Sequence, residues 1–114
     1  GTGIMVPANA TINPLVNLGK GVICNTGSSI DHECIIGDFT HIAPNAVLCG
    51  NVEIGKNSFI GANSVIRQGV HIGNNVIVGA GSVVLTDIPD NMTYVGNPAK
   101  LLVKKDAAQK LVAA

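Results

Sequence analysis

From Val6 to Val84 the chain reads VPANATINPLVNLGKGVICNTGSSIDHECIIGDFTHIAPNAVLCGNVEIGKNSFIGANSVIRQGVHIGNNVIVGAGSVV. An aliphatic residue or a cysteine occupies every sixth position of this stretch without a miss: Val6, Ile12, Leu18, Cys24, Ile30, Ile36, Ile42, Leu48, Ile54, Ile60, Ile66, Ile72, Val78 and Val84. A second series lies four residues after each of these, and from Ala10 to Ser82 it holds only small or β-branched residues. A fixed period of six residues is typical of a parallel β-helix.

A hexapeptide is too short for a strand, a turn and a return strand, so each one forms a single side of a larger coil. Three sides give an 18-residue coil of triangular section, in which residues 18 apart stack at the strand spacing of about 4.8 Å. Gly or Asn often follows the aliphatic residue, and we expect these residues at corners that need unusual φ and ψ. We therefore predict an all-β fold, a parallel β-helix of about four to five coils within residues 1–90.

The hexapeptide register ends near Thr86-Asp87-Ile88-Pro89-Asp90-Asn91, where proline and the Asp and Asn residues favour a break. Residues 91–114 then form a C-terminal extension that we expect to pack on the coil end or on a neighbouring subunit, since an open coil end exposes strand edges. The Ala, Lys, Leu and Gln content of residues 101–114 is compatible with a short helix.

The bulk composition excludes several classes of function. The formal net charge is zero and only 12% of residues are charged, so nothing favours binding to nucleic acid or to an anionic membrane. The chain has no run of about 18 apolar residues that would span a membrane. Its first ten residues do not resemble a signal peptide, and we expect a cytoplasmic location. Cys24, Cys34 and Cys49 form no CxxC pair. Cys24 and Cys34 occupy the two repeat series, so we expect core packing rather than a metal or disulfide role.

His32 is the first candidate for chemistry, because it occupies an outward-facing position between Asp31 and Glu33. Histidine titrates in the range that suits a general base, and a neighbouring carboxylate raises its basicity and orients the ring. A solvated surface histidine beside two acids is the alternative interpretation. Gly50 lies 18 residues later and stacks on His32, so its backbone N–H is a candidate oxyanion donor, an interaction worth about 3 kcal/mol in a transition state. A plain repeat corner explains Gly50 equally well.

His41 lies nine residues after His32, which is half of an 18-residue coil. The two side chains therefore leave opposite sides of one coil and cannot meet within a single chain. They meet if three chains pack around a threefold axis, with His32 of one subunit opposite His41 of the next. The spacing thus favours a homotrimer with sites between subunits.

An uninterrupted hexapeptide ladder that is followed by Gly96-Asn97-Pro98-Ala99-Lys100 resembles the left-handed β-helix acyltransferases of the hexapeptide-repeat family. Within that family, four segments are similar to the branch that acetylates sugars, which includes PglD-like N-acetyltransferases, GDP-perosamine N-acetyltransferase and NeuD-like sialic acid O-acetyltransferases. The segments are Ile12-Asn13-Pro14, Cys24-Asn25-Thr26-Gly27, Ile30-Asp31-His32-Glu33-Cys34 and residues 36–44 with their His41-Ile42-Ala43-Pro44. The resemblance implies a left-handed coil. It also implies a nucleotide-binding αβ domain ahead of the β-helix, which these 114 residues do not include.

The resemblance also implies roles for individual residues. The position matching His32 is the general base and the one matching Glu33 assists it. The positions matching His41, Ala62 and Ala80 contact acetyl-CoA, although alanines also suit a repeat corner.

Other residues have weaker assignments. Asn25 matches a position near the acceptor, to which we also assign Asp31, while a turn asparagine explains Asn25 equally well. Lys100, together with Lys104 and Lys105, is a candidate for the coenzyme A phosphates, although such a charge run also suits a solvated face. His71 has no assigned counterpart and is expected at the surface.

We therefore predict an acetyl-CoA-dependent acetyltransferase that N-acetylates a nucleotide-linked 4-amino sugar in bacterial surface-glycan synthesis, by direct attack and without a metal. An O-acetyltransferase of sialic acid or another sugar is the nearest alternative. A zinc enzyme of the γ-carbonic anhydrase type is a less favoured alternative, because it needs three histidines that converge on one metal. His71 lies two coils and three positions from His32, so it cannot join the same metal. An inactive scaffold is the remaining alternative.

Overall fold

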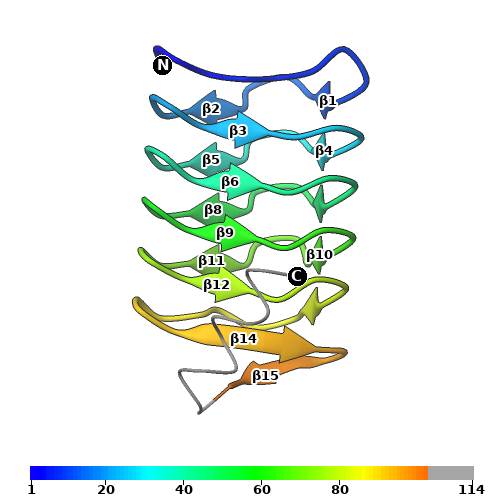
Figure 1. The fold of residues 1–114 in the computed structure, drawn as a ribbon, viewed down its shortest axis with the longest axis vertical. Helices are drawn as coiled ribbons and strands as arrows, with labels where there is room; N and C mark the ends of the chain where they lie inside the picture. The colour runs from blue at the N-terminus through cyan, green and yellow to red at the C-terminus, as the bar shows by residue number, and fades with distance from the viewer. Residues whose placement is uncertain (103–114) are drawn as a thin grey trace.

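The computed structural model describes residues 1–102, and in this range the chain forms short strands joined by tight turns (Figure 1). The strands are β1 (Thr11–Ile12), β2 (Asn17–Leu18), β3 (Ile23–Cys24), β4 (Ser29–Ile30), β5 (Ile35–Ile36), β6 (His41–Ile42), β7 (Val47–Leu48), β8 (Glu53–Ile54), β9 (Phe59–Ile60), β10 (Val65–Ile66), β11 (His71–Ile72), β12 (Ile77–Val78), β13 (Val83–Val84), β14 (Thr93–Gly96) and β15 (Ala99–Leu101). The expected helix falls mostly on residues outside this range. Leu101, the first residue of that segment, ends β15.

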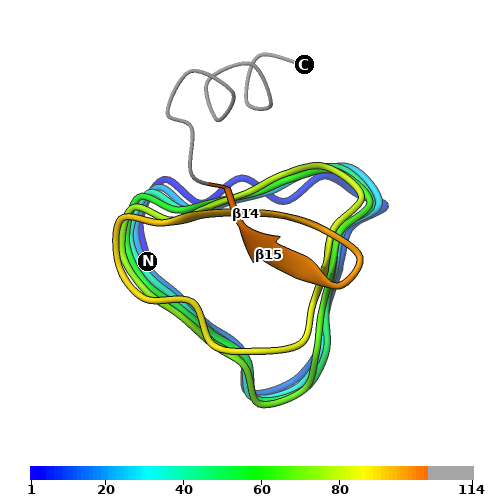
Figure 2. The ribbon, with the colours of Figure 1, turned by 90° about the horizontal axis from the view of Figure 1, so that it is seen from below.

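Three sheets, whose strands pair in parallel from β1 to β14, form the sides of a triangular prism, which Figure 2 shows end-on. Sheet B contains β1, β4, β7, β10 and β13, and sheet C contains β2, β5, β8 and β11. Sheet A contains β3, β6, β9, β12, β14 and β15. Partners in each sheet are 18 residues apart from β1 to β13, as in the pair Ile12 and Ile30. The predicted 18-residue coil is confirmed, and the five strands of sheet B correspond to about five coils.

The coil is left-handed, as the family resemblance implied. In Figure 1 the front strands β3, β6 and β9 run from left to right, and the chain returns behind them through β5 and β8 as it descends. Seen from the N-terminal end, the chain therefore turns counter-clockwise while it moves away from the viewer.

The interior of the prism contains the two predicted series. The aliphatic series is fully buried in the middle coils, where Ile30, Ile42 and Leu48 have no exposed surface. In the second series, the hydroxyl groups of Thr40, Ser58 and Ser64 donate to backbone carbonyl oxygens of the next coil. Thr40 Oγ1 donates to Gly55 O at 2.6 Å and Ser58 Oγ to Gly73 O at 2.9 Å. These bonds satisfy polar groups that would otherwise destabilise an apolar core.

The corners of the prism correct one expectation from the sequence. Positive φ recurs at every sixth residue from Leu15 to Gly81, three positions after each aliphatic residue, and asparagine or glycine fills most of these positions. The glycines directly after the aliphatic residues do not have positive φ, so the expectation of unusual angles there was wrong. They are needed for close packing instead, because a Cβ on Gly37 would lie 2.6 Å from the carbonyl carbon of Gly55.

The C-terminal end of the described chain lies on sheet A. β14 pairs in parallel with β12 at a spacing of 16 residues, Thr93 opposite Ile77, and β15 returns antiparallel to β14. The last coil is thus two residues shorter than the others, and Ile88 still reaches the core beside Ile72. The division into residues 1–90 and 91–114 remains a prediction. Among residues 1–102, no helix is present that has the length and apolarity to cross a bilayer.

Candidate active site

His32 lies in the corner between β4 and β5, where the chain passes from sheet B to sheet C. Its backbone N–H donates to Asp31 Oδ1 at 2.7 Å, and Asn13 Nδ2 on the preceding coil donates to the same oxygen at 3.4 Å. Glu33 follows with a φ of 61°, in the left-handed region. The Asp31 carboxylate therefore holds the turn that presents His32. Asn13, which contributes to this turn, was not identified as a site residue from the sequence.

His32 and Glu33 form a loose pair at the surface. The distance from His32 Nδ1 to Glu33 Oε1 is 3.8 Å, and the two side chains are 52% and 55% exposed. This distance is longer than a hydrogen bond, and an exposed pair of this kind contributes little to stability. The arrangement leaves Nε2 of His32 without a partner among residues 1–102.

Gly50 lies directly beside the imidazole of His32, one coil along. A Cβ on Gly50 would be 2.9 Å from Cε1 and 3.1 Å from Nε2 of the ring. Gly50 does not have a positive φ, so its backbone conformation does not require glycine. Glycine is required because the His32 ring lies too close for a side chain at position 50. Its carbonyl accepts from Gly69 N–H at 3.0 Å, whereas its own N–H has no acceptor in the described range. An unpaired N–H therefore lies beside the candidate base.

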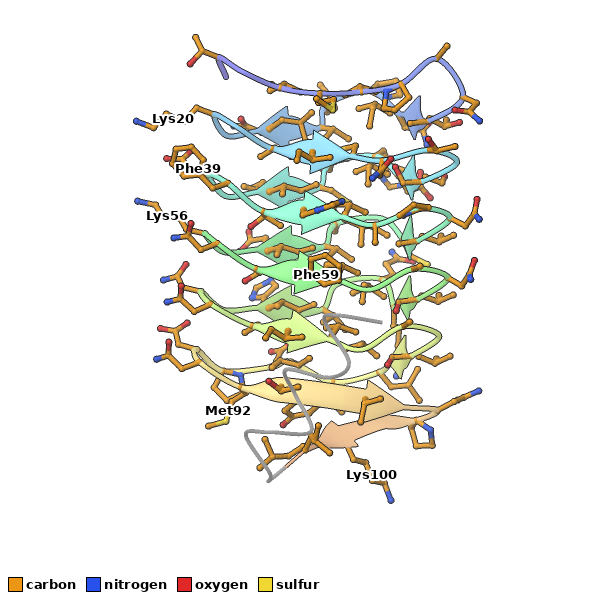
Figure 3. All side chains as sticks on the ribbon, viewed as in Figure 1. Lys20, Phe39, Lys56, Phe59, Met92 and Lys100 are labelled. Carbon is orange, nitrogen blue, oxygen red and sulfur yellow. The ribbon has the colours of Figure 1, made fainter. Side chains whose placement is uncertain are left out.

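His41 lies on β6 in sheet A, on the outer face of the prism. Its Nε2 is 3.3 Å from Asn25 Nδ2, and its ring meets the edge of Phe59 with centroids 5.1 Å apart. Burial lowers the pKa of His41 from its ordinary value. Phe59, labelled in Figure 3, was missed in the sequence, although its position 18 residues after His41 was an available signal.

The structure brings Asn25 to His41 but does not bring His41 to His32. The corner of His32 joins sheets B and C, while His41 lies on sheet A, the opposite side of the triangular section. The placement agrees with the spacing of nine residues. A site that uses both histidines therefore requires a second chain.

The remaining candidates lie on or beside sheet A, toward its C-terminal end. Ala62 follows β9 and Ala80 follows β12, at the corner between sheets A and B. Lys100 on β15 is exposed and points away from the stack (Figure 3). Lys104 and Lys105 lie outside the described residues.

His71 lies on β11 in sheet C, with Nε2 3.8 Å from Glu53 Oε2, and both side chains are exposed. Its exposure agrees with the surface position expected from the sequence. No cluster of three His, Cys, Asp or Glu side chains with metal-binding geometry occurs within residues 1–102.

Two of the cysteines occupy core positions, while Cys49 is half-buried at a corner. Cys24 and Cys34 are buried, and burial raises the pKa of the Cys24 thiol to about 11. Cys34 Sγ donates to the carbonyl of Cys49 at 3.1 Å, and burial raises its pKa as well. Low thiolate content at neutral pH makes both thiols poor nucleophiles.

Comparisons with known proteins agree with the fold and the repeat. Residues 33–68 match the family described as "Bacterial transferase hexapeptide (six repeats)", and residues 51–86 match "Hexapeptide repeat of succinyl-transferase". The acetyltransferase domain of PglB from Neisseria gonorrhoeae FA1090, solved with acetyl coenzyme A, is 38% identical with a TM-score of 0.80. That match covers 88% of this chain and 58% of the PglB domain.

Two further solved structures are similar. PerB from Caulobacter crescentus, in complex with CoA and GDP-perosamine, is 35% identical with a TM-score of 0.79, covering 88% of this chain and 57% of PerB. WeeI from Acinetobacter baumannii AYE is 33% identical with a TM-score of 0.74, covering 87% of this chain and 52% of WeeI. The chain thus spans somewhat more than half the length of these relatives. With its 18-residue coils and its matched repeats, the chain belongs to the hexapeptide-repeat transferase family of left-handed β-helix proteins.

Proposed function

We propose that the protein is an acetyl-CoA-dependent acetyltransferase that N-acetylates a nucleotide-linked 4-amino sugar in bacterial surface-glycan synthesis. The observation that carries the proposal is the His32 corner, where a histidine beside Glu33 lies against a glycine whose N–H has no acceptor among residues 1–102. Base and oxyanion donor are the two groups that acyl transfer from a thioester requires. Solved relatives with acetyl-CoA, or with CoA and GDP-perosamine, support the donor and the class of acceptor.

His32 acts as the general base in this proposal. Glu33 lies on the Nδ1 side of the ring, so Nε2 is the nitrogen that takes a proton from the acceptor amine. The amine nitrogen attacks the thioester carbon, and the Gly50 N–H stabilises the oxyanion that forms. The C–S bond then breaks, the amide product is released, and the imidazolium returns the proton to the coenzyme A thiolate. No acyl-enzyme forms, in keeping with the burial and the raised pKa values of Cys24 and Cys34.

The second wall of the site comes from a neighbouring subunit of a homotrimer. His41, Ala62 and Ala80 of that subunit follow one another along the stack on sheet A and its edge. The two small alanines leave room for a pantetheine arm to lie along this row. Lys100 lies beyond them and is assigned to the coenzyme phosphates. Asn25 and Asp31 are assigned to the acceptor side. The extension of residues 91–114 closes the coil end or contacts the neighbouring subunit.

We place the reaction in the cytoplasm. The three cysteines are all unpaired, which fits a reducing compartment. Acetyl-CoA and nucleotide sugars are both charged molecules that do not cross membranes unaided, so an enzyme that uses them must share their compartment.

A thiol-release assay tests the proposal. Purified protein is supplied with acetyl-CoA and a panel of UDP- and GDP-linked 4-amino sugars, with sialic acid as the hydroxyl acceptor. We expect turnover with an amino sugar, and a loss of about 100-fold or more in His32→Ala. His71→Ala is the matched control, because His71 is also exposed and also lies 3.8 Å from a glutamate, and we expect it to retain turnover.

Undiminished turnover in His32→Ala would show that His32 is not the general base. Turnover with sialic acid and not with amino sugars would replace N-acetylation by O-acetylation at the same site.

A further inference from the structure

The amide of Asn25 has only one orientation that satisfies its neighbours. Asn25 directly follows β3, and its Oδ1 accepts the backbone N–H of Thr26 at 2.7 Å. A backbone N–H can only donate, so the atom that it meets must be the amide oxygen. The amide NH₂ group is therefore the one that faces His41 Nε2 at 3.3 Å.

An amide NH₂ group can only donate, so Nε2 of His41 must present a lone pair. A neutral imidazole carries one N–H and one lone pair, and its remaining proton must then be on Nδ1. We infer that Asn25 is a positioning residue that fixes His41 as the Nδ1–H tautomer, so that the ring offers a hydrogen-bond donor to a ligand carbonyl.

The surroundings of His41 keep the ring neutral. The neighbours in its column on sheet A are Ile23 on β3 and Phe59 on β9, and neither is charged. Cys24, the titratable residue of β3, is fully buried on the other face of the strand. Burial lowers the pKa of His41, in the direction that favours the lone pair at Nε2.

This inference deepens the proposed function and rests on it for the identity of the ligand. Nδ1 of His41 has no hydrogen-bond partner among residues 1–102, so it is the ring atom left to meet a ligand. The donor substrate carries carbonyl oxygens in its thioester and in the amides of its pantetheine arm, and each of these accepts a hydrogen bond. The opposite tautomer would turn a lone pair toward such an oxygen and repel it. Asn25 thereby acts on the coenzyme through His41, besides its assignment to the acceptor.

The test uses the unliganded protein first. Long-range ¹⁵N–¹H correlation spectra of the histidine rings distinguish Nδ1–H from Nε2–H, and we expect the Nδ1–H pattern for His41 in the wild type. Asn25→Asp keeps an oxygen for the Thr26 N–H and replaces the NH₂ donor by an acceptor. We expect His41 in this variant to carry a proton on Nε2 and its pKa to rise, with an unchanged fold by circular dichroism.

The second measurement is calorimetric binding of acetyl-CoA. We expect Asn25→Asp to weaken binding by about tenfold, the size of one lost hydrogen bond. Asn57→Asp is the charge-matched control: Asn57 is an exposed corner residue, and aspartate tolerates its positive φ as asparagine does. We expect it to alter neither the His41 spectrum nor the affinity.

An Nε2–H pattern in the wild type, or the same His41 tautomer in Asn25→Asp as in the wild type, would overturn the inference. Unchanged acetyl-CoA affinity in a variant with the switched tautomer would also overturn it. A wild type that shows the Nδ1–H pattern but binds no acetyl-CoA would support the Asn25–His41 pairing while refuting the proposed function, so the two failures are distinguishable.

Discussion

The imidazole of His32 lies against the α-carbon of Gly50, so close that a methyl group at position 50 would come within 2.9 Å of Cε1 and 3.1 Å of Nε2. The two residues are 18 apart and occupy the same corner of successive coils, and the backbone N–H of Asn51 donates to the His32 carbonyl at 3.0 Å. The contact fixes where the ring can lie relative to the N–H of Gly50, which has no acceptor in the described part of the chain. It also explains the glycine, because φ at Gly50 is not positive.

Gly50→Ala should therefore damage turnover more than stability. The added methyl group displaces the exposed, movable ring of His32, and misplacement of a catalytic group by about 1 Å can cost on the order of 100-fold in rate. We expect a loss of that size in the thiol-release assay, with an unchanged urea midpoint.

The matched control is Gly3→Ala. Gly3 has a φ of 72°, and a Cβ there would meet its nearest neighbours at 3.7 Å, an ordinary contact. We expect Gly3→Ala to lower the free energy of unfolding by about 1 kcal/mol, the usual cost of a left-handed alanine, and to retain turnover. Full activity in Gly50→Ala would show that the His32 position is not critical.

Mixed trimers should locate the site between subunits. If His32 comes from one chain and His41 from the next, a co-refolded equal mixture of His32→Ala and His41→Ala chains has both residues intact in about a quarter of its sites. We expect the mixture to show about a quarter of the wild-type turnover, and each variant alone to be nearly inactive.

A mixture of His32→Ala and Gly50→Ala chains is the control. These residues share one wall of one chain, so no mixed trimer contains an intact wall and no recovery is expected. Failure of the first mixture to recover activity, with trimers verified by light scattering, would contradict the shared site.

Alkaline pH should destabilise the fold through Cys24. Burial raises the pKa of this thiol from 9.0 to about 11, so between these values the unfolded chain loses a proton that the folded chain keeps. The free energy of unfolding therefore falls as pH rises through this window, by at most about 1.4 kcal/mol per pH unit from one group. Urea titrations at a series of pH values measure this slope.

Cys24→Val removes the thiol and keeps an apolar side chain, as at Val78 in the same interior column. We expect a shallower alkaline slope in this variant, leaving the contribution of Cys34, whose pKa is also raised. Identical slopes in the wild type and in Cys24→Val would contradict the assignment to Cys24.

Leu15→Asn should stabilise the protein. Leu15 is 78% exposed and has a φ of 64°, a conformation in which leucine is strained and asparagine is tolerated. We expect a gain of about 1 kcal/mol, read as a higher urea midpoint at constant m-value. The reverse change, Asn57→Leu at another exposed corner with a φ of 54°, should lose a similar amount. A lower midpoint for Leu15→Asn would indicate that Leu15 is buried by another chain in solution.

The interior of the fold was predictable because its period is imposed by packing. Each aliphatic position must point inward for the coil to close, so counting by six assigns Ile30, Ile36 and Ile42 to the core without further information. The corner conformations were misplaced because the φ of a turn depends on hydrogen bonds and on close backbone approach, and both are set by the next coil. Gly37 and Asn57 both look like corner residues in the sequence, yet the first is needed for space and the second for a positive φ.

The contacts of the candidate site were predictable where two residues are 18 apart and stack in one column. They were not predictable where the two residues lie in different columns. Gly50 lies beside His32 because the two share a column. The Asn25–His41 contact joins residues 16 apart, on a diagonal between neighbouring columns, and it depends on side-chain rotamers that the period does not specify. The orientation of the Asn25 amide depends in turn on its hydrogen bond from the Thr26 N–H, which the sequence period does not specify.

The three sides of the prism are built from the same six-residue repeat, and this determines which insertions and deletions the chain tolerates. Six extra residues between Ile36 and His41 would leave every aliphatic side chain inside, so the protein would still fold. The same six residues would move His41 one third of a turn around the axis, from sheet A to sheet B, and separate it from Asn25, which precedes the insertion. Folding thus permits length changes in steps of six, while the site keeps its faces only in steps of 18. During evolution, a protein of this kind can therefore lose or change its activity through a small insertion that leaves its stability unchanged.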